Sequence, residues 1–586
     1  MKKKLLAILL SVCIAIAAAF TLVACGGTGN GGNGNGDSNG GNSAATTTDG
    51  DKSDDKTDNK DNADDKKDDG KKDDGGSTER AETAGLQFVR LADETFEVTG
   101  YNGKDADVYI PSMHSNQKVT SIKAEAFKGN GVITSITIGD YVPRILRETF
   151  SGCTNLTSVT LGAGVTAIGE KAFYNCGKLA SINMPDGLTT IENEVFYGTG
   201  LTGVTLSDNV TSVGSNVFEK CTNLTSASIG NGLTEIAWSM FNGCTKLTNV
   251  TIGNNVKTIG ASAFYNCEKL ANVMLPDGVT DIQDRAFFNC KSLTSIEIPA
   301  GIEHMGQSAF KYSGVTYTDY DNASYIGNKN NNYLVLVEAK SADITSCDIN
   351  ENARVIATGA FRDCVSLAGI TIPDSVITID SFAFYGCTGL TDLAIGNGVI
   401  DIGLRAFYGC KGLTSVSIPD STTKIGDYAF CGCSGLKNLT MGSNVESIGN
   451  EAFEECKALT SVVIPDKVTE IESSTFYGCE ALESVTLPAG LTSIGTGAFN
   501  GCKKLTGVTI PDTVTDIETW AFMDCTALTT ITIPISVKHM GVQVFSGCTK
   551  LTKINCEAKK SNTFGGWKPD WNQGCNATVT WEYTGK

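Results

Sequence analysis

Cysteine is the residue type in this chain best placed to do chemistry, because its thiolate can bind metals or form disulfides. The chain has 21 cysteines, and 15 of them recur three residues after a repeating phenylalanine, from Cys153 to Cys548. Zinc sites need ligands that converge on one point, whereas this spacing spreads the thiols along a line. Parallel Cβ vectors also disfavour disulfides between neighbouring repeats.

The residues that replace cysteine at this position indicate its role. They are Asn130, Thr199 and Ser313, which are all small and able to form hydrogen bonds. The position therefore favours a compact group that satisfies backbone carbonyls at a bend, and we interpret the row as structural thiols. Cys556 and Cys575 lie outside the row, and an exported protein could join them in a disulfide.

Histidine offers little catalytic potential. The three histidines are His114, His304 and His539, and the last two each precede Met-Gly at the same repeat position, which indicates a packing role. The nucleophile-elbow, zinc-protease, P-loop and dinucleotide motifs are absent from the sequence. No pair among the 65 acidic residues is singled out for glycoside hydrolysis. We expect no enzyme, no metal and no cofactor.

The elements that would position these residues follow from a phenylalanine that returns every 23 residues, with one step of 22 and one gap of 51 between Phe310 and Phe361. Such a period is typical of a solenoid, in which each unit covers the apolar face of its neighbour. The 18 phenylalanines are Phe127, Phe150, Phe173, Phe196, Phe218, Phe241, Phe264, Phe287, Phe310, Phe361, Phe384, Phe407, Phe430, Phe453, Phe476, Phe499, Phe522 and Phe545.

One unit reads L-x-x-V-x-I-P, then V-x-x-I, then G-x-x-A-F-x-x-C, as in residues 459–479. The first piece predicts a short strand that ends at proline, and nine of the 12 prolines follow a repeat phenylalanine by 12 residues. The sequence thus predicts a solenoid of mostly short parallel β-strands, one per repeat of about 23 residues, with turns and short helical turns on the convex side.

This pattern resembles the leucine-rich repeats of BspA-like bacterial surface proteins, over about residues 121–555 with one interruption. The C-terminal stretch, with Trp567, Trp571 and Trp581, is similar to the capping segment of such proteins. The resemblance implies a secreted or anchored protein, and adhesins for host proteins or other bacteria occur in the family.

The N-terminus predicts export. Three lysines precede an apolar stretch that is short for a membrane span, and Leu22 to Cys25 resembles a bacterial lipobox with Cys25 as the lipidated residue. An ordinary cleaved signal is the alternative. The following Gly/Asn-rich and Asp/Lys-rich stretch is too polar to fold alone and predicts a tether rather than a calcium site. We therefore expect a membrane-anchored lipoprotein on the bacterial cell surface.

The predicted organisation is a lipoprotein signal peptide (1–24), a disordered tether (25–82), an N-terminal cap (83–120), a first repeat array (121–310), an insert resembling a β-hairpin (311–355), a second repeat array (356–553) and a C-terminal cap (554–586). A net charge of −19 argues against nucleic acid as a partner and favours a soluble monomer.

Two surfaces are candidates for binding. The first is a row of strand residues on the concave face, which includes Thr160, Thr205, Thr251, Thr371, Thr440, Thr486, Thr509 and Thr532. Threonine also simply suits strands, so the row could bind nothing. The second is the insert, where four tyrosines cluster, namely Tyr317, Tyr320, Tyr325 and Tyr333. The alternative for the insert is a degenerate repeat that sets a bend.

Together these features predict a cell-surface protein that binds macromolecules, an adhesin for host or bacterial surface proteins. A glycan- or nutrient-capturing lipoprotein and a structural envelope spacer are the alternatives.

Overall fold

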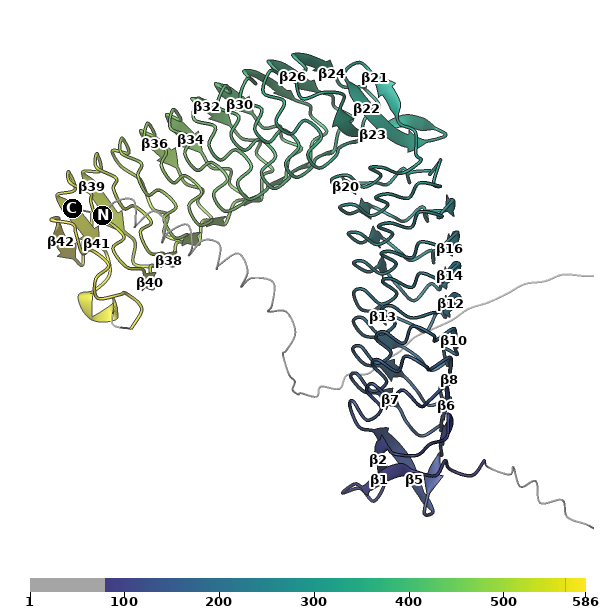
Figure 1. The fold of residues 1–586 in the computed structure, drawn as a ribbon. Coiled ribbons are helices and arrows are strands. Elements are labelled where there is room, and N and C mark those ends of the chain that lie inside the picture. Colours follow the sequence, from purple (N-terminus) through teal and green to yellow (C-terminus); the bar gives the residue numbers. More distant parts are fainter. Residues whose placement is uncertain (1–79, 564, 586) are drawn as a thin grey trace, which may run out of the picture. The chain divides into compact units, whose positions relative to one another are not determined.

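The computed structural model describes residues 80–563 and 565–585. The predicted signal peptide, Cys25 and nearly all of the tether lie outside this range. Within it, short strands stack in parallel from one repeat to the next, and the only helix is the 3₁₀ turn η1 (Lys560–Thr563) (Figure 1). The solenoid fold predicted from the phenylalanine period is confirmed.

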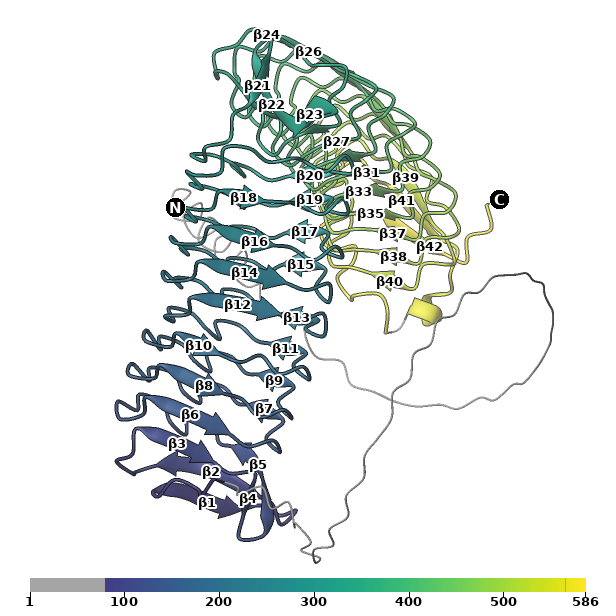
Figure 2. The same cartoon turned by 90° about the vertical axis from the view of Figure 1, so that its right-hand side faces the viewer.

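Most repeats contribute two short strands rather than one, and among the described residues only 295–297 and 507–509 form no strand at the first-face position. Figure 2 shows the strands of the first array as two columns, one from each face of the solenoid. The first-face strands are β3 (Asp107–Ile110), β6 (Ser135–Ile138), β8 (Ser158–Thr160), β10 (Ser181–Ile182), β12 (Gly203–Leu206), β14 (Ser226–Ile229), β16 (Asn249–Thr251) and β18 (Asn272–Val273). The second-face strands are β7 (Arg144–Ile145), β9 (Ala167–Ile168), β11 (Thr190–Ile191), β13 (Ser212–Val213), β15 (Glu235–Ile236), β17 (Thr258–Ile259), β19 (Asp281–Ile282) and β20 (His304–Met305).

The second array repeats this arrangement. Its first-face strands are β24 (Ser346–Asp348), β26 (Gly369–Ile372), β28 (Asp392–Ile395), β30 (Ser415–Ser417), β32 (Asn438–Thr440), β34 (Ser461–Val463), β36 (Ser484–Thr486), β39 (Thr530–Ile533) and β41 (Lys553–Cys556). Its second-face strands are β25 (Val355–Ile356), β27 (Thr378–Ile379), β29 (Asp401–Ile402), β31 (Lys424–Ile425), β33 (Ser447–Ile448), β35 (Glu470–Ile471), β37 (Ser493–Ile494), β38 (Asp516–Ile517) and β40 (His539–Met540).

Both ends are closed by caps. At the N-terminus, β1 (Leu86–Arg90), β2 (Phe96–Tyr101), β5 (Gln117–Ile122) and β4 (Met113–His114) form one sheet in that order. At the C-terminus, β42 (Thr578–Trp581) pairs with β41, and Trp567 and Trp571 are buried. The terminal phenylalanine ring, Phe545, meets Trp571 edge-on at 6.1 Å, so an aromatic side chain covers the last rung.

The insert is part of the sheet rather than a separate excursion. Strands β21 (Thr318–Tyr320), β22 (Ala323–Asn328) and β23 (Asn331–Ala339) are antiparallel, and β23 then pairs in parallel with β25. The hairpin therefore begins the second-face sheet of the second array, and it lies between the two stacks of rungs (Figure 1).

The interior is a column of phenylalanine rings. Neighbouring rings in the second array are nearly parallel, with centroids 4.9–5.8 Å apart, and every ring from Phe361 to Phe545 is fully buried. The insert interrupts the column, so the buried residues form two clusters, one from Val98 to Ala357 and one from Ala323 to Trp571. Each ring lies between the rungs before and after it, so no repeat has an interior of its own.

The expected short helical turns are not formed, because left-handed residues interrupt each one. In the third repeat, Lys171 (φ 57°) lies two residues before Phe173 and Asn175 (φ 56°) two residues after it. The amides of Lys171, Phe173 and Asn175 instead donate to carbonyls of the next rung, at 2.8–3.0 Å. The turn side is therefore held by bonds between rungs as well as by single turns within them, such as that of the Tyr174 amide to the Lys171 carbonyl at 3.1 Å.

Two adjacent phenylalanines allow the ring column to be tested. Phe287 stacks between Phe264 and Phe310 at 5.1 and 5.2 Å and is fully buried, whereas Phe288 is half-buried and stacks on Tyr265 at the surface. Phe287→Ala should lower the free energy of unfolding by about 3–5 kcal/mol, because it leaves a cavity between rungs. Phe288→Ala should cost only about 1 kcal/mol. Denaturant titration measures both, and equal losses would contradict the shared interior.

Candidate functional site

The threonine row lies outward on the first-face strands. Valine at the middle of β8, β16 and β36 points inward, and the following threonine is exposed. The parallel register keeps these positions in line, with Thr205 opposite Ser228 and Ser228 opposite Thr251. The structure thus brings Thr160, Thr205 and Thr251 into one row and Thr371, Thr440, Thr486 and Thr509 into another, all exposed, with Thr532 half-buried at its end.

The four tyrosines of the insert have different surroundings. Tyr320, Tyr325 and Tyr333 contact one another edge-on, with centroids 5.6–6.4 Å apart, and Tyr317 packs against the first core cluster. Tyr325 is fully buried, and its hydroxyl accepts a hydrogen bond from the Asn350 amide at 3.1 Å. As a binding residue, Tyr325 was a wrong prediction, because β22 turns this ring into the core. Tyr320 is 40% exposed, so its ring remains accessible to a binding partner.

A groove beside the insert was not predicted from the sequence. It has a volume of about 880 Å³ and lies between the first-face strands of the first array and the hairpin turn. Its floor includes Met274, which is 85% exposed and occupies the row position that Thr251 holds in the preceding repeat. The sequence feature that could have indicated this groove is a methionine in a row of mostly hydroxyl side chains.

The hairpin turn is fixed against the first array and forms one wall of this groove. The Asn328 side-chain amide donates to the Ile298 carbonyl at 2.7 Å, and the Lys329 amide donates to Glu297 Oε2 at 2.7 Å. The Ile298 amide donates in return to the Gly327 carbonyl at 3.0 Å. Residues about 30 positions apart in sequence are therefore bonded together beside the exposed side chain of Met274.

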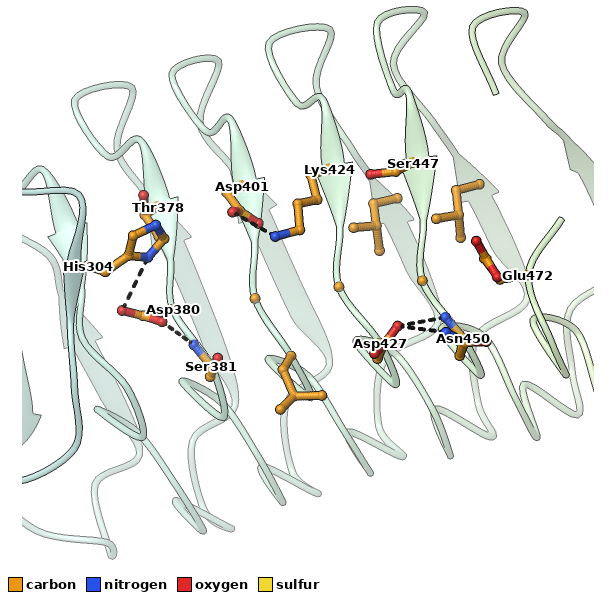
Figure 3. Close-up of a pocket in the computed structure, with 16 residues that line it drawn as sticks. His304, Thr378, Asp380, Ser381, Asp401, Lys424, Asp427, Ser447, Asn450 and Glu472 are labelled. Atoms are coloured by element: carbon orange, nitrogen blue, oxygen red, sulfur yellow. Dashed lines mark hydrogen bonds and ion pairs between the residues drawn. The ribbon is translucent and has the colours of Figure 1, made fainter. Parts of the chain in front are cut away.

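A second, polar pocket of about 360 Å³ lies on the second face, where the two arrays meet (Figure 3). His304 ends the first array, and its Nδ1 lies 3.7 Å from Asp380 Oδ2, in the second array. The same Asp380 oxygen accepts the Met305 amide at 3.0 Å, and Asp380 Oδ1 accepts the Ser381 amide at 2.7 Å. Asp380 thus provides a hydrogen-bond acceptor for the Met305 amide of β20.

The charges around His304 are mainly carboxylates. Hydrogen bonding to Asp380 raises the pKa of His304, and the charges of Asp401 and Asp281 add to this effect. Burial raises the pKa of Asp281. Figure 3 shows Asp401 beside Lys424, whose Nζ is 3.6 Å from Asp401 Oδ2. In the described residues no group of three or more His, Cys, Asp or Glu side chains is placed to bind a metal ion.

The cysteine row lies in the interior beside the phenylalanine rings. Nearly every thiol donates to the carbonyl of the preceding repeat phenylalanine, as Cys176 does to Phe150 at 3.1 Å and Cys387 to Phe361 at 3.0 Å. The exception is Cys364, directly after the insert, which donates to the Ser341 carbonyl at 3.9 Å. Burial raises the pKa of Cys290 and of Cys479 to about 12, so these thiols stay protonated. This is the carbonyl-satisfying role expected from the sequence.

The disulfide that the sequence allows between Cys556 and Cys575 is not formed in this structure, where both are free thiols. Cys556 is fully buried at the end of β41, whereas Cys575 is half-buried near Cys548. His539 contacts Asp516 at 2.6 Å within its own array and therefore shares no site with His304.

The fold and these surfaces define a leucine-rich-repeat solenoid, a scaffold typical of binding proteins. A family model described as "BspA type Leucine rich repeat region (6 copies)" matches residues 106–225, 211–333, 354–483 and 469–566. The chain therefore belongs to the BspA-type leucine-rich repeat family, whose members are typically bacterial surface proteins. No helix in residues 80–563 and 565–585 has the length and apolar character needed to cross a membrane.

Similar solved structures come from several bacteria. One is a leucine-rich repeat protein from Bacteroides ovatus, with 23% identity over 85% of this chain and 98% of that chain and a TM-score of 0.36. Another is a leucine-rich cell surface protein from Faecalibacterium prausnitzii, with 27% identity over 69% and 93% and a TM-score of 0.30. A leucine-rich repeat protein of T. pallidum has 30% identity over 32% and 91%, with a TM-score of 0.31. No curated protein matches the chain.

The contact of His304 with Asp380 predicts a pH-dependent contribution to stability. A raised pKa means that the folded protein holds the proton more tightly than the unfolded chain, whose histidine has a pKa of about 6.5. The contribution is therefore complete below about pH 6 and is lost as the pH rises through the pKa of the folded state. Melting curves should show wild type more stable than His304→Gln at pH 5.5, with a smaller difference at pH 8.5.

Asp380→Asn provides the control for this prediction. With this carboxylate removed, the effect of His304→Gln should differ much less between the two pH values, with only the contribution of Asp401 and Asp281 remaining. A difference that stays constant with pH in the presence of Asp380 would contradict the assignment.

Proposed function

We propose that this protein is a lipid-anchored cell-surface adhesin that binds host or bacterial surface proteins and has no catalytic role. The observation that carries the proposal is the groove at Met274. An 85%-exposed methionine in a hollow of about 880 Å³, rimmed by carboxylate and amide groups, offers a partner both apolar area and hydrogen bonds. Methionine also adapts its shape to varied apolar surfaces.

The rest of the first face supports this assignment. The exposed strand residues are mostly hydroxyl and amide groups in a continuous row, which can lie beneath a large partner without repelling it by charge. Aromatic rings, on which sugars stack, are absent from the predicted positions of this row, so a protein partner suits it better than a glycan. An N-terminal lipid at Cys25 would hold the solenoid at the cell surface.

A substitution at Met274 tests the groove, and the second array supplies a matched control. Val463 occupies the same position, ten residues after its repeat phenylalanine, and is 64% exposed. Met274→Asp should reduce the amount of partner captured from host-cell and bacterial surface extracts at least tenfold, because a charge is buried on binding. Val463→Asp should leave the same captured proteins unchanged. Equal capture by wild type and Met274→Asp would contradict the proposal.

The lipid anchor has its own test. Cys25→Ala should release the protein from the cell fraction into the medium, because no lipid can be attached, while capture of the same partner persists. Immunoblots of cell and medium fractions measure this. A variant that stays with the cells at the wild-type level would show that Cys25 does not anchor the protein.

A further inference from the structure

The turn side of the second array carries a cluster that the proposed function does not use. Its residues lie two before or one after a repeat phenylalanine, so they project from the same turns in consecutive rungs. We call it the arginine–tyrosine strip, and it consists of Arg362, Phe382, Tyr385, Arg405, Tyr408 and Tyr428. All but the exposed Arg362 are half-buried, so each ring keeps an edge at the surface.

Arg405 is at the centre of the strip. Its guanidinium carbon lies 4.5 Å from the centroid of Tyr428 and 5.9 Å from those of Phe382 and Tyr408. Tyr408 stacks on Tyr385 at 4.9 Å, and this stack ends under Arg362, whose guanidinium is 4.9 Å from the Tyr385 ring. The rings hold the two cations in fixed positions through cation–π contacts.

Arg405 differs from Arg362 in lacking an anionic partner. Arg362 Nε lies 3.5 Å from Asp363, whereas Arg405 makes no ion pair in the described part of the chain, and its buried Nε has no hydrogen-bond acceptor. A cation that is fixed but unpaired can bind a carboxylate with little further loss of conformational entropy.

The next rung carries the opposite charge. The Tyr428 hydroxyl donates to Glu451 Oε1 at 2.9 Å, and the Cys431 thiol donates to Glu454 at 3.4 Å. Burial raises the pKa of Glu454 to about 8, and the neighbouring Glu451 adds to this shift. Arg405 and Glu451 hold the same repeat position two rungs apart, which at about 4.8 Å per rung is roughly 10 Å.

We propose that the arginine–tyrosine strip binds an extended polypeptide segment that carries one acidic and one basic residue three positions apart. In the polyproline II form of an extended chain, three residues make one turn and each rises about 3.1 Å, so side chains three positions apart point to the same side. Their spacing of about 9 Å is close to the roughly 10 Å between the positions of Arg405 and Glu451. Tyrosine and arginine are the residue types that contribute most at protein interfaces. A polyanion fits less well, because the glutamates at the end of the strip would repel it. This surface is independent of the groove at Met274.

Peptides displayed at high density on a sensor surface test this proposal with the full-length protein. The probes are Gly/Ser peptides with a glutamate and a lysine three positions apart in either order, and matched peptides with two glutamines. Wild-type protein should be retained on the mixed-charge peptides and not on the glutamine peptides. Arg405→Gln should reduce retention at least about fivefold.

The first array provides the control variant. Arg285 holds the same repeat position as Arg405, two residues before Phe287, but the preceding repeat has Ser262 where the strip has Phe382, and the following one has Ser308 where the strip has Tyr428. Arg285→Gln should leave retention unchanged. Glu451→Gln should weaken retention on the mixed-charge peptides and not on peptides that carry glutamate alone, which separates a lost contact from a folding defect.

Three results would overturn the proposal. The first is equal retention of wild type and Arg405→Gln on the mixed-charge peptides. The second is equal retention of wild type on mixed-charge and glutamine peptides. The third is retention on heparin beads that depends on Arg405 without any retention on peptides, which would assign the strip to a polyanion.

Discussion

The structure depends on ring stacking between repeats that have no interior of their own. Each phenylalanine is buried only because the rungs on both sides cover it, at about 5 Å. The first and last rungs lack one neighbour, and Tyr101 and Trp571 supply the missing contact at 6.4 and 6.1 Å. The thiol that follows most rings satisfies a carbonyl of the preceding repeat, so the stacking of rungs also favours cysteine three residues after the phenylalanine.

This constraint makes the surface as regular as the interior. Because consecutive rungs keep one register, a given position in the repeat becomes a row of side chains along the solenoid. Most rows are chemically uniform, as the threonine row is. Departures from uniformity are therefore informative, and Met274 is one of them, because it replaces a hydroxyl or amide side chain without changing the backbone that carries it. Arg405 is distinguished instead by its neighbours, because Phe382 and Tyr428 hold the same repeat position in the rungs on either side.

The sequence predicted what repeats and missed what depends on contacts between distant segments. The phenylalanine period predicted the stacked interior, and the position of proline predicted where the first-face strands end. The sequence indicated a second short extended piece, V-x-x-I, but not a second strand, because two residues such as Thr258–Ile259 carry too little alternation to indicate one. Lys171 and Asn175 prevent the expected helical turn through left-handed backbone angles that the residue types do not reveal. Tyr325 is buried because β23 pairs with β25, a pairing with no local signal.

The insert explains why the candidate sites lie where the repeat is interrupted. A solenoid with unbroken register presents flat rows, which can cover a partner but cannot enclose it. Between Phe310 and Phe361 the register is broken, and the hairpin joins the second-face sheet of one array while its turn bonds to the other. Two concave sites arise there, the groove at Met274 on one face and the pocket at His304 on the other. The break in the repeat is therefore what gives this otherwise uniform molecule places that a specific partner could recognise.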